Sequence, residues 1–105
     1  MLVMLSIEEL FNLVIENNTV SCIVMSMMSH PMDVTICSHG ARALEWIIKT
    51  GGSSVSKLLI DEGVFDVCID VIQNHDDIEL ISSVSFLLIK IVKASSRMMN
   101  ILFIL

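Results

Sequence analysis

The chain has 105 residues, of which 54% are hydrophobic, and its formal net charge is -6. This length allows one domain at most. The six Lys and Arg residues are scattered along the chain, so the charge pattern excludes the basic patch of a nucleic-acid-binding protein.

Neither membrane spans nor disulfides are predicted. No apolar run approaches the roughly 18 residues that span a bilayer, so we expect no transmembrane segment. The start of the chain carries Glu8 and Glu9 and lacks the basic region of a signal peptide. Cys22, Cys37 and Cys68 form no Cys-x-x-Cys pair, which is typical of reduced thiols in a cytoplasmic protein.

The first predicted element is a short helix at about residues 7–17. Ser6 and Glu9 form the Ser-x-x-Glu pattern of a capping box at its start. Asn18 tolerates the left-handed conformation that commonly ends a helix, so we expect a break there. A second helix, at about 19–29, follows this break because its apolar residues recur at helical spacing.

The longest helix of this first set is predicted at about 33–49. Pro31 cannot continue the preceding helix, and Asp33 can cap the next one. The segment "TGGSS" at 50–54 then breaks the chain.

The rest of the chain predicts the same three helices again. A short helix ends at Gly63, which occupies the place of Asn18 and tolerates the same conformation. A helix at about 64–74 follows, and then a long helix at about 76–93 that Asp76 can cap. No segment shows the alternation of a strand, so the predicted fold class is all-α.

The two sets of helices are copies of one another. An offset of 45 residues aligns Ile15 with Ile60 and His30 with His75, and after the histidines the offset becomes 44. The aligned pairs include Val20/Phe65, Val24/Ile69, Met27/Ile72, Asp33/Asp77, Ile36/Leu80, Leu44/Leu88, Ile47/Ile91 and Lys49/Lys93. This period predicts an α-solenoid with repeat 1 at about 6–50, repeat 2 at about 51–94 and a partial third repeat at about 95–105.

Two stretches carry a resemblance to a known family. "LLIDEGVFDVCIDVIQNHDDIELISSVSFLLIKIV" resembles the armadillo repeat, and so does "MMSHPMDVTICSHGARALEWIIK" with its Gly-Ala-x-Ala-Leu centre. The resemblance covers nearly the whole chain and implies an armadillo-like superhelix that binds other proteins in a groove lined by the third helices. Arg42 and Phe86 align with the family's groove Trp, and Trp46 and Lys90 align with its groove Asn. The missing Asn argues against importin-like capture of extended basic peptides.

A polar stripe on the two long helices forms the candidate binding site. An aromatic residue and cations lie within this stripe on both helices, and aromatic and Arg side chains dominate binding hot spots. The alternative interpretation is that Trp46 and Phe86 pack against neighbouring helices as part of the core. The candidate partner-binding residues are His39, Arg42, Trp46, Ser83, Phe86 and Lys90.

We therefore predict a non-catalytic protein-interaction module that binds another protein or peptide. The alternative is a purely structural segment of a large assembly or multi-domain regulatory protein, with no ligand of its own. Catalysis, cofactors and metals are not predicted. Cys37 and His39 point to different faces of a helix, and His30 and His75 lack ligand spacing to a cysteine.

The last residues predict self-association. The segment "RMMNILFIL" at 97–105 is apolar nearly all round, and the helices that would cover it in a complete third repeat are missing from the sequence. We expect the chain to be a piece of a longer protein or a subunit that a neighbour completes.

Overall fold

The computed structural model describes residues 5–95, and these residues form helices and no strand. The predicted all-α class is therefore confirmed. In chain order the helices are α1 (Ile7–Glu16), α2 (Thr19–Ser29), α3 (Val34–Gly51), α4 (Ser53–Asp61), α5 (Val64–Asn74) and α6 (Ile78–Ala94). The predicted third partial repeat lies outside the described residues except for residue 95.

Side chains cap the helices where the sequence predicts them in the first set. The Ser6 hydroxyl accepts a hydrogen bond from the backbone N–H of Glu9 at 3.1 Å, at the start of α1. The Asp33 carboxylate accepts one from the backbone N–H of Ile36 at 3.1 Å, at the start of α3. Each cap satisfies a backbone donor that has no partner within the helix.

The cap of α6 corrects the sequence prediction. Asp77, not Asp76, accepts a hydrogen bond from the backbone N–H of Leu80, at 2.9 Å, and the helix begins at Ile78. The preceding His75 has extended backbone angles, φ -127° and ψ 144°. His75 turns inward in this conformation, and the cap lies one residue later than predicted, at Asp77.

The breaks between the short and middle helices are confirmed. Asn18 has φ 55° and ψ 33°, and Gly63 has φ 86° and ψ 20°, so both adopt the left-handed conformation. Asn and Gly adopt the left-handed conformation with less steric strain than other residues. Equivalent positions of the two sets therefore make the same turn.

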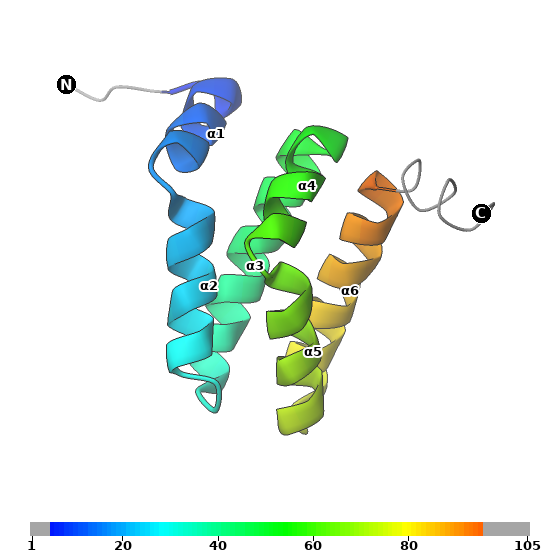
Figure 1. The fold of residues 1–105 in the computed structure, drawn as a ribbon. Helices are drawn as coiled ribbons and strands as arrows, with labels where there is room; N and C mark the ends of the chain where they lie inside the picture. Colours follow the sequence, from blue (N-terminus) through cyan, green and yellow to red (C-terminus); the bar gives the residue numbers. More distant parts are fainter. Residues whose placement is uncertain (1–4, 96–105) are drawn as a thin grey trace.

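The two helix sets lie side by side (Figure 1). α3 packs along α6, and α2 contacts α5, so equivalent helices are neighbours. α2 and α5 lie in front of α3 and α6 in this view, and the short helices α1 and α4 lie above them. The buried residues between these layers are Val20, Val24, Met27, Cys37, Ala41, Leu44, Ile47, Ile48, Val55, Leu59, Val64, Val67, Cys68, Val71, Leu80, Val84, Leu87 and Ile91.

Among the described residues, no single helix is both long and apolar enough to cross a membrane. Only α1 and α2 taken together meet the length and composition needed, and they are bent by 62° at the break between them.

Candidate functional site

A cation joins the two long helices on the face that the sequence singles out. The ammonium group of Lys90 on α6 lies 3.0 Å from a carboxylate oxygen of Glu45 on α3. The same ammonium group lies 5.8 Å from the centre of the Phe86 ring. Phe86 itself is 58% exposed. The salt bridge and the cation–π contact therefore hold a large aromatic ring in place while leaving it open to solvent.

A hollow adjoins this ring. It has a volume of about 240 Å³ and is lined by Glu45, Ser82, Ser83 and Phe86. Ser83, Phe86 and Lys90, three of the six predicted site residues, therefore lie together. We call the surface formed by Glu45, Ser82, Ser83, Phe86 and Lys90 the α3–α6 face.

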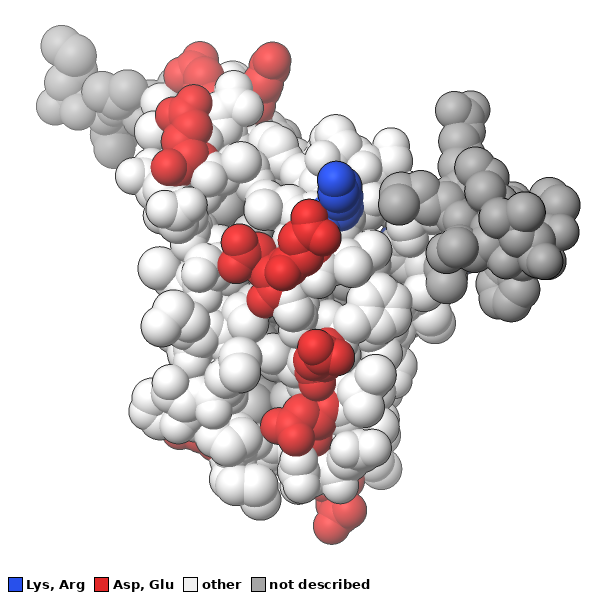
Figure 2. All heavy atoms as spheres, viewed as in Figure 1, with Lys and Arg blue, Asp and Glu red and all other residues white. Residues whose placement is uncertain are grey.

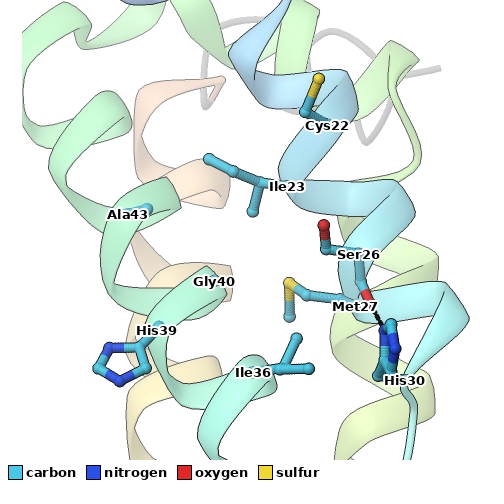
Figure 3. A pocket seen from close by; sticks show the side chains of 9 residues that line it. All are labelled: Cys22, Ile23, Ser26, Met27, His30, Ile36, His39, Gly40 and Ala43. Atoms are coloured by element: carbon cyan, nitrogen blue, oxygen red, sulfur yellow. Dashed lines mark hydrogen bonds between the residues drawn. The ribbon is translucent and has the colours of Figure 1, made fainter.

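The predicted site residues Arg42 and His39 on α3 lie on different surfaces. Arg42 is exposed at the position equivalent to Phe86. His39 is exposed but lines a different groove, between α2 and α3. In Figure 3 its ring points away from Met27 and Ile36.

Trp46 is half-buried, and its surroundings bear on the two interpretations that the sequence leaves open. Its ring centre lies 6.3 Å from that of Phe11 on α1, with the ring planes tilted by 53°. Both rings pack against the buried core. Tilted pairs at this separation are favourable beyond the area they bury. Trp46 therefore packs α1 against α3, and only part of its ring remains open to solvent.

The sequence interpretation missed an apolar groove between α2 and α3 (Figure 3). At Gly40 the Met27 side chain lies directly against α3, since a Cβ atom there would lie 2.6 Å from the Met27 sulfur. The volume of the groove is about 420 Å³. The residues that line this α2–α3 groove are Cys22, Ile23, Ser26, Met27, His30, Ile36, His39, Gly40 and Ala43.

A second groove, of about 540 Å³, lies between α2 and α5. Met27 and Met28 line it from α2, together with four acidic residues. Figure 2 shows acidic side chains gathered along the middle of this side of the molecule. Asp66 and Asp70 lie one helical turn apart on α5, and Glu62 lies at the C-cap of α4. The acidic residues are Asp61, Glu62, Asp66 and Asp70.

The cysteines are free thiols, two buried and one exposed. Burial raises the pKa of Cys68 to about 12. Burial, and to a smaller extent the negative charges of Asp33 and Asp70, raise the pKa of Cys37. A thiol with a raised pKa stays protonated at neutral pH, whereas the thiolate is the nucleophile. Neither buried thiol is therefore activated, and only Cys22 is open to solvent.

The two repeated histidines have different surroundings. His75 is 8% exposed, and its Nε2 donates a hydrogen bond to the backbone carbonyl of Pro31, which joins the two helix sets. His30 is exposed, and its Nδ1 lies 3.2 Å from the carbonyl of Ser26. In the part of the chain between residues 5 and 95, no three His, Cys, Asp or Glu side chains gather as a metal site would require.

Comparison with known proteins finds no matching family model and no match among the curated proteins or solved structures.

Proposed function

We propose that the chain is an armadillo-like pair of helical repeats that binds another protein or peptide through the α3–α6 face. The helix order of short, middle and long supports this proposal, since it occurs twice with equivalent turns at Asn18 and Gly63. The buried reduced thiols favour a reducing compartment such as the cytoplasm.

The exposed Phe86 ring carries the proposal. A Phe that is 58% exposed gains little for folding, but in a partner's pocket it would bury its remaining surface. The adjacent hollow could accept a partner side chain. Glu45 and the Ser82 and Ser83 hydroxyls offer polar groups around the apolar ring, as the rim of a binding site does.

The salt bridge between Lys90 and Glu45 determines which chemical groups a partner can present to the α3–α6 face. Because Lys90 already neutralises Glu45, the face carries no unpaired acid at its centre, and recognition rests on apolar contact and hydrogen bonds. We therefore expect the bound segment to present an apolar side chain to Phe86 and polar groups to the serines.

A selection experiment tests this function. Peptides selected from a random displayed library on the full chain are measured for affinity against the parent chain, Phe86→Ala and Met25→Ala. Met25 is 63% exposed on α2 and serves as the matched control. Phe86→Ala is expected to weaken binding by about 2 kcal/mol, roughly thirtyfold, while Met25→Ala leaves it unchanged. Peptides that bind both variants equally would contradict the proposal and favour the purely structural alternative.

A further inference from the structure

The contact between the two helix sets shows which surfaces a repeat buries against its neighbour. Residues of α5 and α6 that face the first set are covered by it: Val67, Val71, Val84 and Leu87 are all at most 5% exposed. Their equivalents in the first set are Cys22, Ser26, Gly40 and Ala43, which line the open α2–α3 groove. The α2–α3 groove is thus the surface of the first set that corresponds to the covered surface of the second set, but no further helix set among the described residues covers it.

On the opposite side of the second set, residues are exposed whose equivalents in the first set are buried. Val24 is 4% exposed and Ile48 is 3% exposed, whereas their equivalents Ile69 and Val92 are 45% and 37% exposed. We call this surface the α5–α6 edge. Its apolar residues, which are partly or largely exposed among the described residues, are Phe65, Ile69, Ile81, Leu88, Ile89 and Val92.

Several side chains of the α2–α3 groove are smaller, and some of the α5–α6 edge are larger, than their equivalents in the other helix set. The groove, of about 420 Å³, holds Gly40 and Ala43 where the second set holds the larger Val84 and Leu87. On the α5–α6 edge the change runs the other way, because Phe65 and Ile81 are larger than their equivalents Val20 and Cys37. A hollowed surface and a bulky one on the same chain are complementary in the way that a packed interface requires.

The positions of the Glu45–Lys90 ion pair hold apolar residues at their equivalents in the other helix set. Between the two sets, Glu45 pairs with Lys90. At a junction of the same geometry between two copies, Ile89 of one copy would replace Glu45, and Trp46 of the next would replace Lys90. An apolar pair thus replaces an ion pair on both sides at once. Ile89 is 50% exposed and Trp46 is half-buried, so both have surface left to cover.

We propose that the α2–α3 groove of one copy receives the α5–α6 edge of a second copy, so that copies join head to tail by repeating the contact between α2–α3 and α5–α6. Such a contact is heterologous, so each dimer leaves one groove and one edge for further copies. The proposal rests on the equivalence of the two helix sets. It does not involve Phe86, which lies outside both surfaces.

The test uses two charged variants of the full chain, each blocking one surface. Ala43→Glu places a charge in the groove, and Ile69→Glu places one on the edge. Met25→Glu is the control, because Met25 is exposed, at 63% compared with 45% for Ile69, and lies outside both surfaces. Sedimentation velocity over a range of micromolar concentrations measures their association, and circular dichroism checks that each variant keeps the parent's helical signal.

The parent chain and Met25→Glu should form species that grow with concentration. Each blocked variant alone should associate about a hundredfold more weakly, because a buried unpaired charge costs several kcal/mol. A mixture of the two blocked variants should restore association and stop at a one-to-one dimer, since each supplies the surface that the other lacks. Trp46 is the single Trp of the chain, so its emission should shift to shorter wavelengths in that mixture and in neither blocked variant alone.

Three outcomes would overturn the proposal. A parent chain that stays monomeric would mean that the groove and the edge do not bind each other. Association that survives in either blocked variant, or a mixture that stays monomeric while the parent associates, would mean a different interface. Phe86→Ala should associate as the parent does, so that loss of peptide binding and loss of association are separate results.

Discussion

Trp46 and Phe86 each lie in the polar stripe of a long helix, but Trp46 is half-buried and Phe86 is 58% exposed. Their replacement by Ala should therefore change stability by different amounts. Trp46→Ala removes a ring that packs on Phe11 and on the core. A fully buried Trp→Ala change costs about 3–5 kcal/mol. Because Trp46 is half-buried, about half of that is expected, and it includes the aromatic pair, worth about 0.5–1.5 kcal/mol.

Phe86→Ala is the matched comparison. Its ring is 58% exposed, and its contact with the Lys90 ammonium group is the one that the change removes. An exposed cation–π contact is worth about 0.5–1 kcal/mol. Both changes place Ala inside a long helix and gain similar helix propensity, so the difference between them reports packing alone. We expect Phe86→Ala to cost less than about 1 kcal/mol.

Urea unfolding followed by circular dichroism measures both. Trp46→Ala should lower the free energy of unfolding by about 2 kcal/mol, or the melting temperature by about 8–16 °C for a domain of this size. The measurements are made at two protein concentrations, so that any contribution from association is separated. Equal stability of the two variants would refute the packing assigned to Trp46 and Phe11.

Two further predictions concern the turn at Gly63 and the thiol of Cys68. Gly63→Ala should lower stability by about 1–2 kcal/mol, because φ is 86° there and no atom lies near enough to clash, so the cost is conformational. Gly63→Asn should cost less, since Asn18 makes the equivalent turn, and equal losses in urea unfolding would contradict this explanation. Burial raises the pKa of Cys68 to about 12, whereas an unfolded thiol titrates near about 8.5. The folded state therefore holds its proton more tightly, so this stability is fully present below about pH 8.5 and is lost as pH rises toward 12, by about 1.4 kcal/mol per unit. Cys68→Ala should flatten this decline in the unfolding free energy, and an unchanged slope would be the contrary result.

Much of the fold could be predicted because the signals are local. Asp33 and the left-handed residues Asn18 and Gly63 act within a few residues of the chain, so their positions fix helix starts and ends. The error at Asp76 has a tertiary cause. His75 donates its hydrogen bond to Pro31, a residue 44 positions away, and this contact delays the start of α6.

The candidate site could be predicted only in part for the same reason. Helical spacing places His39 and Trp46 on one stripe of α3 and Phe86 on the equivalent stripe of α6, but it does not say which neighbours cover them. Phe11 approaches Trp46 from another helix, and no periodicity within α3 indicates that contact. The α2–α3 groove likewise depends on a comparison of Gly40 and Ala43 with the larger residues of the second set, which becomes informative once the burial of both sets is known.

The most direct test of the proposed function is a nuclear magnetic resonance titration of the isotope-labelled full chain with a selected peptide. Binding at the α3–α6 face predicts that the signals of Ser82, Ser83 and Phe86 shift most, and that the same titration of Phe86→Ala shows no saturable change. Shifts centred instead on Asp66 and Asp70 of the acidic groove, or on Gly40 and Ala43 of the α2–α3 groove, would contradict the proposed site.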